Sequence, residues 1–168
     1  YMKFAGEAVL RKHWRNLIAR YGAYPVVWCA AGEACAEYYL DSPAGSEDEF
    51  EAHTRAAWTR IVRSIREMDP YQHPVTIHPR TKGHEEVDDL SVLDMNWLQP
   101  GHPGYRAFRS TINLLTDALA LEPKMPVIVD EANYEGITGA CNADQQRFLF
   151  WSCMLSGAAG HTYGANGL

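Results

Sequence analysis

Apolar residues at helical spacing alternate along the chain with short, continuous apolar runs. Steps of three and four residues place apolar side chains on one helix face, whereas a short run rich in β-branched and aromatic residues is typical of a buried strand. The pattern predicts helices over residues 8–21, 46–68, 105–119 and 144–155, and strands over 25–30, 74–77, 91–97, 126–129 and 157–163. Ser46 and Glu49 form a predicted capping box at the start of the second helix.

This alternation of strand and helix is typical of right-handed βαβ units with an all-parallel sheet, either doubly wound or closed into a barrel. No G-x-G-x-x-G follows any predicted strand, so a dinucleotide-binding fold loses its main support. A (β/α)₈ TIM barrel has eight strands, and this chain supplies about five. The sequence therefore predicts an α/β fold in which residues 1–168 form one partial barrel domain.

Charge and composition exclude several classes of partner. The net charge is −6 and there is no cluster of Lys and Arg, which argues against nucleic acid because phosphate backbones are bound by basic side chains. No apolar run approaches the roughly 18 residues that a membrane span needs, so no membrane contact is expected. The four cysteines lack C-x-x-C spacing. Neither a zinc site nor a disulfide framework is expected, and no cofactor is predicted.

Polar and aromatic residues gather where the predicted strands end, which is where ligands bind in parallel α/β folds. From the first strand to the last they are Glu33, then His78, then Asn96, Trp97, Gln99 and His102, then Glu131, Tyr134 and Glu135, and finally His161 and Tyr163. Glu33 and Glu131 lie three βα units apart and would face each other across a barrel mouth. Retaining glycosidases use two carboxyl groups about 5–5.5 Å apart, so these two are the predicted catalytic pair.

Other functions remain open at this point. Seven histidines could indicate a metal-dependent hydrolase on the same fold, although no H-x-H or H-E-x-x-H spacing supports a metal site. Cys29 and Cys35 flank the end of the first strand, where a nucleophilic cysteine would need a nearby histidine. A barrel that binds carbohydrate without catalysis is a further alternative, because a fold does not fix a function.

Four blocks of sequence resemble one family in the same order along the chain. They are VWCAAGE at 27–33, LQPGH at 98–102, PVIVDEANYEG at 126–136 and LSGAAGHTYG at 155–164. Together they resemble the apiosidase-like glycoside hydrolases, which are family 140 and its relatives. Relatives often have Asp where this sequence has Glu33, a change that keeps the carboxyl group.

The resemblance implies a bacterial (β/α)₈ barrel, periplasmic or secreted, that cleaves a plant-type polysaccharide or oligosaccharide by retaining double displacement. The family places its acid/base after strand four and its nucleophile after strand seven, which implies these roles for Glu33 and Glu131. This chain would then cover about strands four to eight and need the missing first half of the barrel. Tyr134 would orient Glu131, Glu135 competes for the nucleophile role, and the substrate-binding residues implied are Gln99, His102, His161 and Tyr163.

Overall fold

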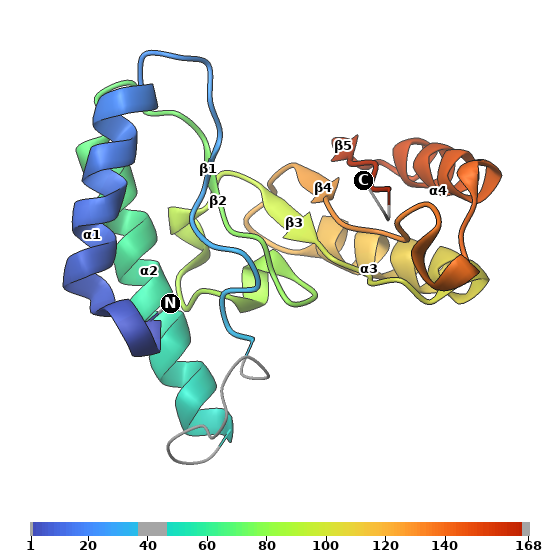
Figure 1. Cartoon of the computed structure of the whole chain (residues 1–168), viewed down its shortest axis with the longest axis horizontal. Helices are drawn as coiled ribbons and strands as arrows, with labels where there is room; N and C mark the ends of the chain where they lie inside the picture. Colours follow the sequence, from blue (N-terminus) through green and yellow to red (C-terminus); the bar gives the residue numbers. More distant parts are fainter. Residues whose placement is uncertain (1, 37–46, 166–168) are drawn as a thin grey trace. The chain divides into compact units, whose positions relative to one another are not determined.

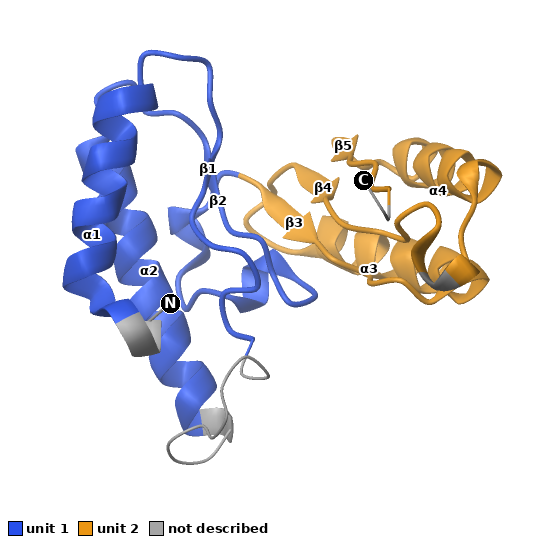
Figure 2. Cartoon of the chain, in the orientation of Figure 1, with its two compact units in different colours: residues 1–94 blue, residues 95–168 orange. Residues whose placement is uncertain are grey.

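The structure is a computed structural model that describes residues 2–36 and 47–165 (Figure 1). The chain divides into two compact units, residues 1–94 and residues 95–168 (Figure 2). Each unit contains a small parallel sheet and two α-helices. In the described residues, no helix has the length and apolar character that crossing a membrane requires.

The first unit consists of two helices and a two-stranded sheet. Its elements are α1 (Met2–Tyr21), β1 (Trp28–Cys29), α2 (Glu47–Met68) and β2 (Val75–Thr76), followed by the 3₁₀ turns η2 (Gly83–Glu85) and η3 (Leu90–Val92). The helices α1 and α2 lie side by side (Figure 1). Strands β1 and β2 pair in parallel, with Trp28 opposite Val75. The predicted cap residue Ser46 lies outside the described residues.

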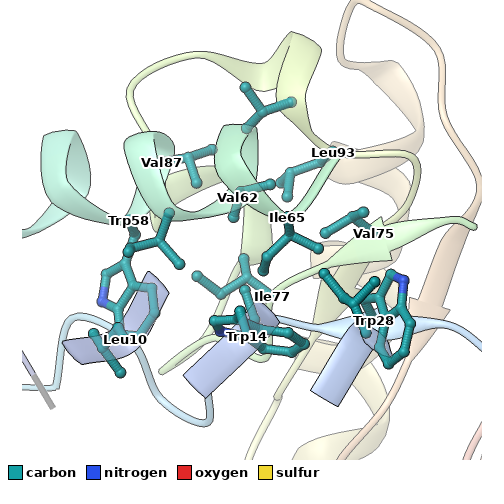
Figure 3. Packing of buried hydrophobic residues seen from close by; sticks show 14 of the residues in the cluster. Leu10, Trp14, Trp28, Trp58, Val62, Ile65, Val75, Ile77, Val87 and Leu93 are labelled. Carbon is teal, nitrogen blue, oxygen red and sulfur yellow. The ribbon is translucent and has the colours of Figure 1, made fainter. Parts of the chain in front are cut away.

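The core of the first unit lies between these helices and the sheet. Trp58, Ile61 and Ile65 recur at helical spacing on α2 and are at most 1 % exposed, so they form its buried face. They pack with Trp14 of α1 and Val75 of β2 (Figure 3). Burial of this apolar surface is the main stabilising term for the unit. It holds β1 and β2 in place, and with them the start of the loop that follows each strand.

The second unit repeats strand and helix around a three-stranded sheet. Its elements are β3 (Asn96–Leu98), η4 (Gly104–Arg106), α3 (Ala107–Ala120), β4 (Val127–Val129), η5 (Ile137–Gly139), α4 (Ala143–Leu155) and β5 (Gly160–His161). The strand order is β3-β4-β5 and both pairs are parallel. Leu98, Val127 and Val129 are fully buried and pack with Leu115 of α3 and Leu149 of α4. The helices therefore cover that face of the sheet.

The predicted parallel pairing is confirmed for all three strand pairs that the structure describes. The strands are shorter than predicted, at two or three residues each. The predicted strand over 91–97 is wrong in its first half, where η3 occupies Leu90–Val92. The Asp89 side chain accepts hydrogen bonds from the Ser91 backbone N–H at 3.0 Å and the Ser91 hydroxyl at 2.6 Å. This local capping favours a tight turn over an extended strand.

Asp69 ends α2 and holds the turn that leads into β2. Its side chain is buried and accepts hydrogen bonds from the Trp28 indole N–H at 2.9 Å and from the backbone N–H groups of Tyr71 and His73. Its Oδ2 also lies 2.8 Å from Nδ1 of His73. Burial alone would raise the pKa of Asp69, but the hydrogen bonds from Trp28, Tyr71 and His73 outweigh it and lower the pKa to about 2.

We expect Asp69→Asn to lower the free energy of unfolding near neutral pH by about 2–4 kcal/mol, because an amide cannot accept all of these hydrogen bonds. The lowered pKa means that the stabilisation by Asp69 is present above its ordinary value of 3.8 and is lost as the pH falls toward about 2. Chemical denaturation should therefore show the free energies of unfolding of the parent protein and Asp69→Asn converging as the pH falls over that range. The exposed Asp88→Asn is the control, and an equal loss for it would contradict this account.

Candidate active site

Glu33 lies in a tight turn just beyond β1. The parallel pairing continues past the strand, since the Ala30 N–H donates to Thr76 O at 2.8 Å and the His78 N–H donates to Ala31 O at 3.0 Å. Glu33 then has a φ of 46°, in the left-handed region that residues with a Cβ rarely adopt. Its side chain is half-buried. The pairing therefore brings Glu33 and His78 to the same end of the β1–β2 sheet, as the sequence predicts.

A pocket of about 340 Å³ adjoins this turn within the first unit. Gly32 and His78 line it together with the rings of Trp14 and Trp58 and the side chain of Cys29. The lining is mostly apolar, and His13 and His78 are the titratable histidines among its residues. A pocket with this composition suits a ligand that presents an apolar face and a few polar groups.

In the second unit, Glu131 follows β4 and contacts His102 from the loop after β3. The Nε2 of His102 lies 3.1 Å from Oε1 of Glu131, and both side chains are largely buried. The Tyr134 backbone N–H donates to Nδ1 of His102 at 3.4 Å. With Nδ1 as the acceptor, the tautomer of His102 that carries its proton on Nε2 can donate a hydrogen bond to Oε1 of Glu131.

Tyr134 packs against the same histidine. The ring centroids of His102 and Tyr134 are 4.5 Å apart. Gly164 also lies so close to the Tyr134 ring that an added Cβ would come within 2.0 Å of it. The backbone N–H of Glu135 also donates to Gly164 O at 2.8 Å. The loops after β3, β4 and β5 thus meet around Tyr134, which makes a cluster of His102, Glu131 and Tyr134.

Asn133 fixes the backbone between these residues. It is buried, has a φ of 42°, and its amide exchanges two hydrogen bonds with the backbone of Gly104, at 2.8 and 3.0 Å. Its own N–H donates to Gly101 O at 3.1 Å. Asn133 was missed as a site residue in the sequence. Asparagine tolerates left-handed backbone, and its position two residues after Glu131 is the signal that was present.

Glu135 lies at a different place on the loop. It forms an isolated parallel bridge with Ala165, and its charge contributes, after burial, to the raised pKa of the Cys141 thiol. Glu131, in contrast, directly follows the sheet and contacts His102. The two rival carboxylates therefore have different surroundings, because Glu131 contacts His102 whereas the Glu135 backbone pairs with the segment after β5.

Asn96 and His161 are not brought to the cluster of His102, Glu131 and Tyr134. Asn96 opens β3 and is 1 % exposed, at the amino end of the strand rather than at its carboxyl end. His161 pairs with Val129, whose side chain faces the helices, and its ring lies 5.8 Å from that of Phe150 on α4. Burial lowers the pKa of His161. Its ring therefore faces α4.

The remaining predicted residues lie near the strand ends. Trp97 pairs with Ile128, on the face of the sheet opposite to Leu98 and Val129, which pack on the helices. Gln99 is half-buried just beyond β3, and Tyr163 is exposed just beyond β5. Trp97 and Gln99 are therefore placed where a ligand at this end of the sheet could reach them.

The sequence also allows two other kinds of active site, one with a nucleophilic cysteine and one with a bound metal ion. Burial raises the pKa of the Cys35 thiol above its ordinary range, and the charge of Glu86 adds to this effect. Burial also raises the pKa of Cys153 to about 11. A thiol held in its neutral form is a poor nucleophile. Within residues 2–36 and 47–165, no group of three or more His, Cys, Asp or Glu side chains forms a candidate metal site.

Solved glycoside hydrolases share this fold. A glycoside hydrolase family 5 protein from Bacteroides vulgatus aligns with a TM-score of 0.72 and 24 % identity, over 95 % of this chain and 36 % of that one. A second glycoside hydrolase gives 0.72 and 23 %, over 95 % and 38 %. The β-glucuronidase of Bifidobacterium dentium, complexed with coumarin-3-O-glucuronide, gives 0.63 and 15 %, over 95 % and 27 %.

These likenesses define the class of fold as α/β, of the kind that glycoside hydrolases use. The family model "Apiosidase-like, catalytic domain" matches residues 2–168. The chain belongs to this family, and the resemblance noted in the sequence is confirmed. No curated protein matches the chain. The chain spans between 27 % and 38 % of the length of the three solved structures.

The close contact of Gly164 with Tyr134 can be tested by adding one methyl group. Gly164→Ala should lower the free energy of unfolding by about 1–3 kcal/mol, because its Cβ would overlap the Tyr134 ring. Gly160→Ala is the matched control in the same segment, since its Cβ would meet Ile128 at an ordinary 3.5 Å. Chemical denaturation measures both. If both variants unfold at the same denaturant concentration as the parent protein, the contact does not constrain the loop.

Proposed function

We propose that the protein is a retaining glycoside hydrolase that uses Glu131 as nucleophile and Glu33 as acid/base. The observation that carries the proposal is the contact of Glu131 with Nε2 of His102 at the end of β4, in a chain of the apiosidase-like family. Both glutamates lie in the loops at the carboxyl ends of parallel strands, which is where catalytic groups lie in (β/α)₈ barrels.

In this proposal the chain forms strands four to eight of the barrel. Strand β1 is then the fourth strand and β4 the seventh, which agrees with acid/base and nucleophile positions of the family. The solved glycoside hydrolases are more than twice as long as this chain, which supports a barrel completed by further strands. Those strands would supply the other side of the substrate pocket.

The reaction would proceed in two displacements. Glu131 attacks the anomeric carbon while Glu33 gives its proton to the departing glycosidic oxygen, so one C–O bond forms as another breaks. Glu33 then takes a proton from water, and the resulting hydroxide displaces Glu131 from the sugar. In this role His102 would donate a hydrogen bond from Nε2 to Oε1 of Glu131, 3.1 Å away, and so help to orient the nucleophile.

We propose a plant-type oligosaccharide or polysaccharide as substrate, with a terminal apiose as the first sugar to test. The family name supports this choice, because it describes apiosidase-like catalytic domains. Trp97, Gln99, His102 and Tyr163 would contact the sugar, with His78 on the side of Glu33. Trp97 offers a flat apolar surface on which a sugar ring could stack.

Three isosteric variants test the assignment of the nucleophile. Glu131→Gln should lower kcat about 10⁴-fold or more on plant oligosaccharides, because an amide cannot form the glycosyl-enzyme ester. Glu135→Gln, the control four residues away, should lower it less than about 10-fold. Glu33→Gln should lower it by an intermediate factor of about 10²–10⁴, which is the usual contribution of a general acid.

Covalent trapping gives the same assignment by an independent route. A 2-deoxy-2-fluoro glycosyl fluoride should leave its sugar on Glu131, and peptide mass spectrometry identifies the labelled residue. A label on Glu135, or full activity of Glu131→Gln, would show that the nucleophile is assigned to the wrong carboxylate. All of these experiments use the parent protein with its complete barrel, and no release of sugar by it from any plant oligosaccharide would contradict the proposed activity itself.

A further inference from the structure

Glu86 is a buried carboxylate that joins two strand-end loops of the first unit. It is only 3 % exposed, and each of its oxygens accepts a hydrogen bond from a backbone N–H. The Cys35 N–H donates to Oε2 at 2.6 Å, and the Arg80 N–H donates to Oε1 at 3.0 Å. Cys35 lies two residues after Glu33, and Arg80 lies two residues after His78. A buried carboxylate is stable only when its oxygens are paired in this way.

The turn that carries Glu33 needs such support. A left-handed φ at a residue with a Cβ is strained and persists only where its surroundings hold it. One hydrogen bond within the turn runs from the Ala36 N–H to Glu33 O at 3.0 Å. The turn is also held from outside, because the Trp58 indole N–H donates to Ala34 O at 2.9 Å and the Cys35 N–H donates to Glu86.

The Glu86 carboxylate accepts hydrogen bonds from backbone N–H groups, while the nearby Arg80 guanidinium pairs with another carboxylate. The guanidinium of Arg80 bonds Glu51 at 2.6 Å, while the backbone N–H of the same residue donates to Glu86. The Cys35 thiol lies close enough for the charge of Glu86 to add to the raised pKa of that thiol. Glu86 thus acts as a double acceptor between the turn after β1 and the loop after β2.

We infer that Glu86 is a positioning residue for Glu33. It fixes the Cys35 N–H, and with it the direction in which the Glu33 carboxyl group leaves the turn, and it ties this turn to the loop that carries His78. The inference rests on the proposed acid/base role of Glu33. A proton donor must lie within hydrogen-bond reach of the leaving oxygen, so a loosened turn should impair protonation of the leaving group more than any other step.

The dependence of the rate on the leaving group separates this role from a purely structural one. A phenoxide leaving group needs a proton from Glu33, whereas 2,4-dinitrophenolate departs without one. The two test substrates are the phenyl and the 2,4-dinitrophenyl glycoside of the sugar that the parent protein releases from plant oligosaccharides. Glu86→Gln should lower kcat/KM for the phenyl glycoside about 10–100-fold, because one backbone N–H loses its acceptor. For the dinitrophenyl glycoside the change should stay within about 3-fold.

Two further variants make the test specific. Glu85→Gln is the matched control, because it removes a neighbouring exposed carboxylate that pairs only with the side chains of Lys82 and His84 in the described contacts. It should leave both rates within about 2-fold of the parent values. Glu86→Asp keeps the charge but shortens its reach, so it should show the same selective loss as Glu86→Gln.

An equal loss on both glycosides, or no loss on either, would overturn the positioning role. The same conclusion follows if neither Glu86 variant folds, because Glu86 would then serve the fold rather than the alignment of Glu33. Glu33→Ala separates this inference from the proposed function, since it should show the selective loss in its strongest form. If Glu33→Ala reduces both rates equally, the acid/base assignment fails, and the inference fails with it.

Discussion

The arrangement of the second unit depends on backbone pairing that continues beyond β4. Ala132 forms a parallel bridge with Gly101 in the loop after β3, and Glu135 forms one with Ala165 after β5. A loop held on both sides by main-chain hydrogen bonds has little freedom to shift. Glu131 therefore leaves the sheet in a fixed direction, and His102 is brought to it by the neighbouring loop.

Left-handed backbone occurs at or near both predicted catalytic carboxylates, and it is held in a similar way in each case. Glu33 itself is left-handed, and Asn133 is left-handed two residues after Glu131. Each strained position is held by buried polar groups, with Glu86 and Trp58 around the first and Gly104 facing the second. Strain of this kind is common where a side chain must be held in an active geometry. The two units thus use the same device with different residues.

The sequence predicts the elements better than their ends. Helical spacing at Trp58, Ile61 and Ile65 predicts α2 because that spacing reflects its buried face. The turn at η3 is missed because it depends on the side chain of Asp89, and hydrophobic pattern does not report such capping. The strand-end rule brings Glu131, His102 and Tyr134 together correctly, since parallel neighbours share one end.

The sequence fails to predict contacts between residues that are far apart along the chain. His161 follows the same rule as His102, yet the register places it opposite Val129 and directs its ring to α4. Register is not visible from one strand alone. Glu86 lies 51 residues from its partner Cys35 and has no local motif, so only the folded structure reveals the contact. The sequence already shows that Glu131 lies nearer to the end of the strand than Glu135. The contact of Glu131 with His102 is seen only in the structure.

The anomeric configuration of the first-formed product tests the central claim most directly. Proton NMR during hydrolysis of a plant oligosaccharide records which anomer of the released sugar appears before mutarotation equilibrates it. Double displacement by Glu131 and Glu33 inverts the anomeric carbon twice, so the account predicts that the product first appears with the configuration of the substrate. A product that first appears with the opposite configuration would contradict a glycosyl-enzyme on Glu131, because a single displacement by water would then be the mechanism.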